Sequence, residues 1–135
     1  MTYIRSQKTF LEVTQLNKIG ITLKGSGSYV PHQVLSNYDL SKIVDTSDEW
    51  IQTRTGISER RIAKSNENVC DMGYLAALNA LEMAEWSPES IDLIILATST
   101  PSDLFGSAPI IQSKLGAKNA FAFDLTAACS GFLFA

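Results

Sequence analysis

The chain has 135 residues, of which 45% are hydrophobic and 19% are charged, a balance typical of a globular domain. Its net charge of −3 argues against the polybasic surface by which proteins bind nucleic acid or anionic membranes. One histidine and two widely spaced cysteines, Cys70 and Cys129, argue against a metal site and a thioredoxin-like redox pair. Without a signal peptide or membrane span, we expect a protein of a reducing compartment, most simply the cytoplasm.

The beginning of the chain is polar and then becomes strand-like. Residues 1–18 are interpreted as a polar N-terminal extension of one domain that covers residues 19–135. The run from Ile19 to Leu23 predicts a short strand, which ends in a turn of glycines and serines. Ser36 is expected to cap a short helix through "NYDLSKIV".

The stretch "TSDEWIQTRTG" predicts a second short helix. Thr46 and Glu49 suit a capping box at its start, and Gly56 suits a left-handed stop after its end. Trp50 and Arg54 are four residues apart, so a helix places them on one face. An aromatic ring beside a guanidinium suits a nucleotide, because the ring stacks on a base and arginine pairs with phosphate.

The remaining chain alternates between helices and buried strands. A long helix is predicted from Asn66 to Trp86, followed by Ser87 as the cap of a turn that begins at Pro88. "IDLIILATST" reads as a buried parallel strand, "SAPIIQSKLG" as a short helix and "AFAFDL" as the last strand, with another helix after it. This order predicts an α/β layered fold with a mostly parallel sheet, whose ligands bind at the carboxyl ends of the strands.

Cys129 lies at such a strand end, in "AACSG". Small neighbours at a sharp turn from a strand into a helix are typical of a nucleophile elbow. The backbone N–H groups at the start of a helix favour a thiolate and suit the oxyanion of an attacked carbonyl. The alternative is that Cys129 is a small buried hydrophobic residue, which is our interpretation of Cys70 in the middle of the long helix.

Two motifs identify a resemblance. "DTSDEWIQTRTGISERRI" and "FDLTAACSGF", together with "GSGSYVP", "LIILATSTP" and "IQSKLG", closely resemble the β-ketoacyl-acyl-carrier-protein synthase III family. These acyltransferases start type II fatty-acid synthesis and have a thiolase-like fold of two similar halves. The resemblance runs from about Ile19 to Ala135. It implies that the chain is the amino-terminal half, truncated before the half that carries the catalytic histidine and asparagine.

The resemblance also implies roles for particular residues. Cys129 matches the nucleophile that takes the acetyl group from acetyl-CoA. Trp50 matches the tryptophan that stacks on the CoA adenine, Arg54 the arginine that contacts the CoA phosphates, and Thr46 a threonine near the adenine. Phe105 matches a phenylalanine that reaches across the family's homodimer into the partner's acyl pocket.

The implied reaction is a decarboxylative Claisen condensation through an acyl-cysteine intermediate. The acetyl-enzyme would react with malonyl-acyl-carrier protein and give acetoacetyl-acyl-carrier protein, with no cofactor and no metal, since the CoA thioester is a substrate. Arg60, Arg61 and Lys64 are candidate contacts for the acidic carrier protein. The single histidine, His32, lies in a loop where the family has no catalytic residue, and we expect it to be at the surface.

Two alternatives stay open. One is a non-catalytic fragment or scaffold that keeps only this half of the fold. The other is a related CoA-dependent thiol acyltransferase with another primer or acceptor. By itself, a chain of these 135 residues is expected to lack condensing activity.

Overall fold

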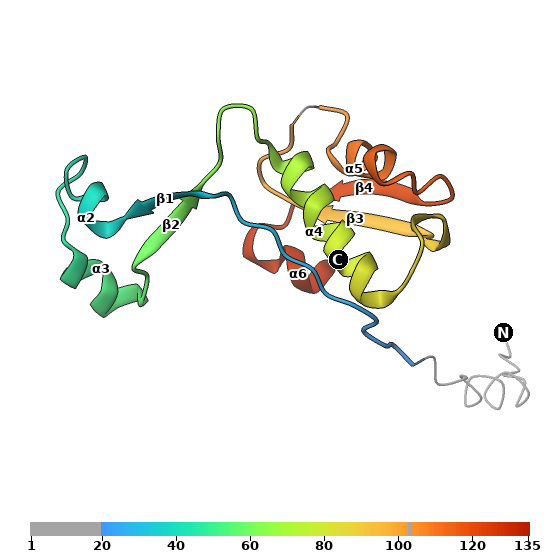
Figure 1. Ribbon diagram of the computed structural model, residues 1–135, viewed down its shortest axis with the longest axis horizontal. Coiled ribbons are helices and arrows are strands. Elements are labelled where there is room, and N and C mark those ends of the chain that lie inside the picture. The colour runs from blue at the N-terminus through green and yellow to red at the C-terminus, as the bar shows by residue number, and fades with distance from the viewer. Residues whose placement is uncertain (1–19, 103) are drawn as a thin grey trace, which may run out of the picture.

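The computed structural model of the protein describes residues 20–102 and 104–135 (Figure 1). The predicted N-terminal extension, residues 1–18, lies outside the described residues. The elements, in chain order, are β1 (Gln33–Ser36), α2 (Asn37–Leu40), α3 (Asp48–Thr55), β2 (Glu59–Ile62), α4 (Val69–Ala84), η1 (Pro88–Ser90), β3 (Leu93–Ala97), α5 (Ala108–Leu115), β4 (Phe121–Leu125), η2 (Ala128–Ser130) and α6 (Gly131–Phe134).

The larger part of the molecule is built on a parallel pair of strands, β3 and β4. Leu93 lies opposite Phe121 and Ala97 opposite Leu125, so the carboxyl ends of the two strands lie side by side. Helix α5 contacts both strands and α4 contacts α5 (Figure 1). The predicted α/β class with parallel strands and intervening helices is therefore confirmed.

A second, antiparallel pair of strands was not predicted from the sequence. Strand β1 pairs with β2, and together with α2 and α3 they form a small unit at one end of the molecule (Figure 1). The sequence of β2, Glu-Arg-Arg-Ile, has little of the β-branched and aromatic character on which strand prediction rests. Its backbone becomes a strand because β1, remote in the sequence, supplies the hydrogen-bond partners.

The predicted strand from Ile19 to Leu23 is wrong for the described residues 20–23, which form no strand. Ile21 is 99% exposed and Leu23 is 85% exposed. The apolar pattern is present, but among the described residues no strand is paired with this segment. A strand needs both the side-chain pattern and a neighbour that accepts its backbone hydrogen bonds.

The segment that follows crosses α4 at very close range. A Cβ atom at Gly27 would lie 2.1 Å from the carbonyl oxygen of Ala76, and one at Gly25 would lie 2.4 Å from that of Ala80. The amide of Asn79 also donates a hydrogen bond of 2.9 Å to the carbonyl oxygen of Ser28. Only glycine permits this approach of the backbone to the helix.

Two helix starts differ from those predicted. The N-cap of α3 is Ser47, whose hydroxyl accepts a 3.1 Å hydrogen bond from the Trp50 N–H, and not Thr46. The long helix α4 begins after Asn68, which forms a capping box with Asp71, and not at Asn66. Both stretches offer several residues that can cap a helix, so the sequence pattern does not fix which one does.

The predicted helix ends are correct at both glycines. Gly56 ends α3 with a φ of 71° and Gly116 ends α5 with a φ of 74°. These are left-handed conformations that other residues adopt at a cost, so the glycine positions give a reliable signal for a helix stop.

An ion pair ties α4 to α5 and gives a pH-dependent contribution to stability. Lys114 Nζ lies 2.7 Å from Asp71 Oδ1, and this hydrogen bond is the main reason that the pKa of Asp71 is below its usual range. A lowered carboxyl pKa stabilises the fold above about pH 4, and the contribution is lost as the pH falls through the folded-state pKa. We expect Asp71→Asn to be less stable than wild type at pH 6, with the difference closing toward pH 2. Urea unfolding midpoints of both proteins between pH 6 and pH 2 would measure this difference in stability. A difference that stays the same at every pH would contradict the prediction.

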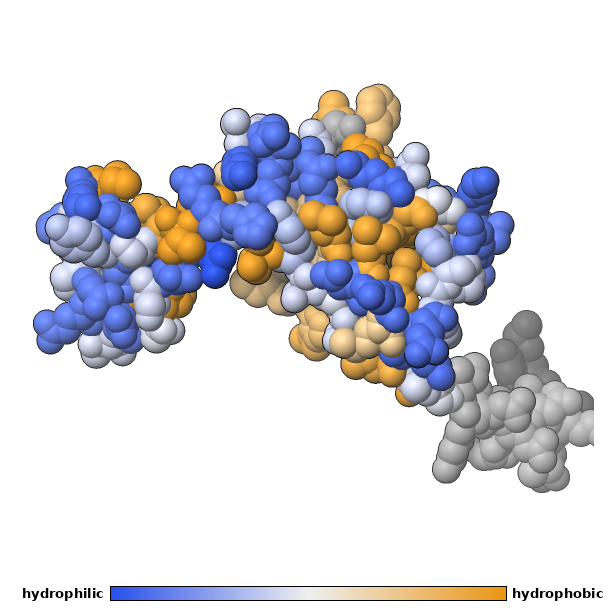
Figure 2. Space-filling model, viewed as in Figure 1, coloured by the Kyte–Doolittle hydropathy of each residue, from blue (hydrophilic) through white to orange (hydrophobic). Residues whose placement is uncertain are grey.

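Apolar side chains remain on the surface of the β3–β4 part of the molecule (Figure 2). Phe121 is 80% exposed, and the three apolar residues of α6 after Gly131 are also exposed: Phe132, Leu133 and Phe134. Within the residues that the structure describes, no helix is both long and apolar enough to span a membrane.

Candidate functional site

Cys129 lies in η2, on the turn that leads from β4 into α6, and its side chain is exposed. The preceding residue, Ala128, has a φ of 45°, a left-handed conformation that is strained for a residue with a Cβ atom. A sharp, strained turn that presents a reactive atom is the geometry of a nucleophile elbow. The alternative that Cys129 is a buried hydrophobic residue is therefore wrong.

The base of this turn is held by the ends of both parallel strands. The Thr98 N–H donates to the carbonyl oxygen of Leu125 at 3.0 Å, and the Thr126 hydroxyl donates to the carbonyl oxygen of Thr98 at 3.1 Å. A Cβ atom at Gly131 would lie 2.9 Å from the Cβ of Ala97, so this glycine lets α6 begin directly against the end of β3. The sheet thus positions the thiol at its carboxyl edge, as predicted.

Cys70 has the opposite environment. It is 1% exposed, and its sulfur lies 3.2 Å from the hydroxyl of Ser102 and 3.8 Å from the carbonyl oxygen of Ser107. It lies in the first turn of α4 and not in the middle of the helix, because α4 begins later than predicted. Its burial confirms the interpretation of Cys70 as a packing residue.

The residues predicted to bind a nucleotide lie together on α3 and just before it. The guanidinium carbon of Arg54 lies 4.5 Å from the centre of the Trp50 ring, and Trp50 is 53% exposed. Asp45, Thr46, Ser47 and Trp50 line a surface hollow of about 410 Å³. A ring face and hydroxyl groups at this hollow, with the cation of Arg54 over the same ring, suit the stacking of a base and the pairing of phosphate.

The structure places this group of residues and Cys129 in different parts of the molecule. Helix α3 belongs to the small unit at one end, whereas the η2–α6 turn lies beside β3 and β4 (Figure 1). A ligand that reaches both sites must therefore be extended, with a nucleotide at one end and a reactive group at the other.

Phe105 lies in the loop before α5 and is 91% exposed. The residue that anchors this loop, Asp124 of β4, was not predicted from the sequence. Its carboxylate accepts hydrogen bonds from the backbone N–H groups of Ser107 at 2.8 Å and Ala108 at 2.7 Å. The signal for it was an acidic residue inside an otherwise apolar strand.

Of the three basic residues predicted to contact the carrier protein, Arg60, Arg61 and Lys64, the first two are less available for binding a partner than the sequence indicates. Arg60 points into the small unit, where it donates to the side-chain oxygen of Asn37 at 2.9 Å and to the carbonyl oxygen of Leu35 at 3.2 Å. Arg61 lies 3.4 Å from the Glu59 carboxylate. Lys64 is exposed. His32 is also exposed, as predicted.

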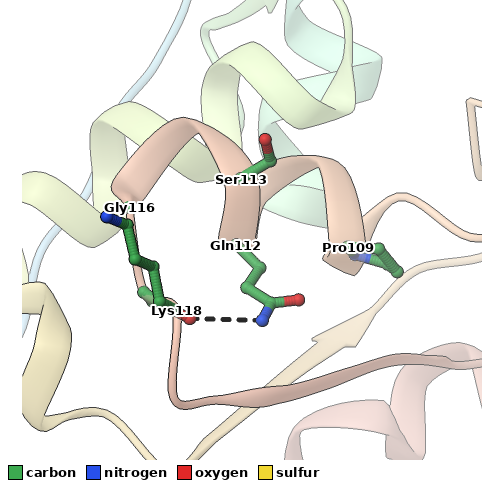
Figure 3. Close-up of a pocket in the computed structure, with 6 residues that line it drawn as sticks. Pro109, Gln112, Ser113, Gly116 and Lys118 are labelled. Atoms are coloured by element: carbon green, nitrogen blue, oxygen red, sulfur yellow. Dashed lines mark hydrogen bonds between the residues drawn. The ribbon is translucent and has the colours of Figure 1, made fainter.

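A separate hollow of about 340 Å³ lies along α5 (Figure 3). Gln112 is its central polar side chain, and its amide donates to the carbonyl oxygens of Ala117 at 3.2 Å and Ala120 at 2.7 Å. These bonds hold the turn between α5 and β4. None of the predicted site residues lines this hollow, so we assign it a structural role.

Comparison with known proteins gives a consistent result. The chain is 72% identical over 125 residues to a protein from Prochlorococcus marinus (strain MIT 9515) named beta-ketoacyl-[acyl-carrier-protein] synthase III, covering 93% of this chain and 37% of that protein. A scan of family models found no match to the chain. The chain thus spans well under half the length of this relative.

Two solved structures that match this chain are also condensing enzymes by name. The fold matches 3-oxoacyl-[acyl-carrier-protein] synthase III from Aquifex aeolicus VF5 with a TM-score of 0.83 and 56% identity, over 86% of this chain and 38% of that one. It also matches the priming β-ketosynthase of the R1128 polyketide biosynthetic pathway with a TM-score of 0.80 and 42% identity, over 83% and 34% of the two chains. The chain therefore has the thiolase-like α/β fold of these condensing enzymes and is similar over most of its length to β-ketoacyl-acyl-carrier-protein synthase III, which confirms the resemblance predicted from the sequence.

Proposed function

We propose that the protein acts as a β-ketoacyl-acyl-carrier-protein synthase III, with Cys129 as its nucleophile. The observation that carries this proposal is the exposed thiol on a strained turn at the carboxyl edge of a parallel sheet. It is supported by the names of the relatives that match this chain.

The proposed reaction has two steps. The Cys129 thiolate attacks the thioester carbon of acetyl-CoA, the C–S bond to CoA breaks, and CoA leaves as a thiol after taking up a proton. Malonyl-acyl-carrier protein then loses carbon dioxide, and its carbanion attacks the acetyl-cysteine, which releases Cys129 and acetoacetyl-acyl-carrier protein. Backbone N–H groups near Cys129 would stabilise the oxyanion of each tetrahedral intermediate. A histidine and an asparagine from the second half of the family's fold, which the 135 residues of this chain do not include, would stabilise the charge that decarboxylation creates.

In this proposal CoA is the extended ligand that joins the two parts of the site. Its adenine stacks on Trp50 near Thr46, its phosphates pair with Arg54, and its thioester reaches Cys129. The guanidinium of Arg54 lies over the Trp50 ring at 4.5 Å, which supports this arrangement because it keeps the cation beside the ring on which the base would stack.

Further parts of the proposal concern partners and location. We propose acyl-carrier protein as the partner that delivers the malonyl group, a cytoplasmic location, and a homodimer in which Phe105 shapes the partner's acyl pocket. The high exposure of Phe105 supports the last point.

The CoA site is tested by replacing its two central side chains in the full-length protein. We expect Trp50→Ala and Arg54→Ala each to raise the KM for acetyl-CoA by roughly tenfold or more, because stacking and charged phosphate contacts are each worth about 1–3 kcal/mol. Matched controls are Trp86→Ala, at an exposed tryptophan outside the site, and Arg61→Ala. An unchanged KM for acetyl-CoA in both site variants would show that CoA does not bind at the hollow beside Trp50.

A second candidate is the condensation of another primer, and a specific observation favours it. One matching structure, at 42% identity, is a priming ketosynthase of a polyketide pathway. Measuring acyl transfer from acetyl-, isobutyryl- and longer acyl-CoA donors to Cys129 separates the two candidates. The preferred donor identifies the primer, and failure to acylate Cys129 with any of them favours a non-catalytic scaffold.

A further inference from the structure

One fully buried polar side chain lies at the centre of the small unit. Asn37 is 1% exposed, and its amide nitrogen donates to Asp48 Oδ1 and to the carbonyl oxygen of Ile57, both at 2.7 Å. Its amide oxygen accepts a hydrogen bond of 2.9 Å from the Arg60 guanidinium. Both amide hydrogens and the oxygen are therefore paired, which fixes the orientation of the side chain.

The three partners of this amide flank both ends of α3. Asp48 is the first residue of the helix, while Ile57 and Arg60 follow the glycine that ends it. The Asn37 backbone N–H adds a 3.1 Å bond to the carbonyl oxygen of Ser58. Asn37, the first residue of α2, thus connects the chain directly after β1 with the chain at both ends of α3.

Apolar packing contributes little to the placement of α3. Ile51 is the one buried residue of the helix, and the side chains of Trp50 and Arg54 are exposed. With so small an apolar contact, the angle of the helix depends on directional hydrogen bonds, which are strong where they are shielded from water. Bonds from Gln52 and then Asn37 hold the pKa of the Asp48 carboxyl below its usual range, as expected of a carboxylate that takes part in this network.

We propose that Asn37 is a positioning residue for the CoA site: by holding both ends of α3, it sets the place and angle of the Trp50–Arg54 pair. This inference rests on the proposed function of that pair. Asn37 itself is buried and acts through α3, so its effect is on binding of the nucleotide and not on the chemistry at Cys129.

The test uses two acetyl donors with the full-length protein. Acetyl-CoA carries the nucleotide, whereas the acetyl thioester of N-acetylcysteamine carries the same reacting group without it. We expect Asn37→Asp, which replaces two donors by a carboxylate facing Asp48, to raise the KM for acetyl-CoA roughly tenfold with kcat little changed. The rate of Cys129 acetylation by the short thioester should stay at the wild-type value.

Two further variants sharpen the result. The exchange Asn37→Asp with Asp48→Asn restores a hydrogen bond between the two positions and should recover part of the KM. If Asn37→Asp fails to fold, Asp48→Ala serves in its place, because it removes the acceptor from an exposed position. It should likewise raise the KM for acetyl-CoA and leave the rate of acetylation by the short thioester unchanged. Asn119→Asp is the matched control, because its exposed amide bonds the carbonyl oxygen of Glu89, away from α3.

The outcomes separate this inference from the function on which it rests. Equal losses with both donors, or no loss in a folded Asn37→Asp, while Trp50→Ala raises the KM for acetyl-CoA, would overturn the positioning role and leave the CoA site intact. If Trp50→Ala and Arg54→Ala leave that KM unchanged, the CoA site itself is overturned, and the role of Asn37 falls with it.

Discussion

Replacing Cys129 by serine should abolish formation of the acetyl-enzyme and lower condensation by roughly a thousandfold or more, because a serine hydroxyl at this turn is a far weaker nucleophile than a thiolate. The substitution changes one exposed atom and should leave the fold intact. Intact-mass and peptide mapping after brief exposure of the full-length protein to acetyl-CoA would measure it. Wild type should gain one acetyl group on Cys129, and the variant none.

Cys70→Ser is the matched control for this experiment. Its sulfur is buried beside Ser102, so the variant should keep acetylation at Cys129 even if it loses some stability. Acetylation of Cys129→Ser at the wild-type rate, or of Cys70 in place of Cys129, would contradict the assignment of the nucleophile.

Replacing Asp124 by alanine should lower the free energy of unfolding by about 2–4 kcal/mol, since its carboxylate accepts two backbone N–H groups at the start of α5. Ser107 cannot take over, because its hydroxyl makes no cap bond within α5 and instead accepts the N–H of Ser102 at 2.7 Å. Asp124→Asn keeps an acceptor oxygen but loses the charge, so it should cost less. Urea unfolding would give both values.

The control for Asp124 is Asp92→Ala, an exposed acidic residue just before β3, which should change stability by no more than about 0.5 kcal/mol. An effect of Asp124→Ala as small as this would show that α5 does not depend on the carboxylate. It would also show that Asp124 does not anchor the loop that carries Phe105.

The sequence was sufficient wherever the cause is local. The β3–α5–β4 succession, the helix stops at Gly56 and Gly116, and the turn that carries Cys129 follow from apolar runs, glycine conformations and small residues that are neighbours in the chain. The placement of Arg54 over the Trp50 ring on one helix face follows from their spacing of four residues. These parts of the candidate site were therefore predictable.

Tertiary structure decided whatever depends on a partner remote in the chain. Strand β2 exists because β1 pairs with it, whereas the apolar residues 20–23 form no strand in the absence of a paired neighbour among the described residues. The anchoring roles of Asn37 and Asp124 depend on hydrogen bonds to backbone or side-chain groups that are distant in the chain. Sequence alone determined the turn that carries Cys129 and the helix face that Trp50 and Arg54 share; long-range hydrogen bonds, which periodicity does not encode, determined how each is held in place.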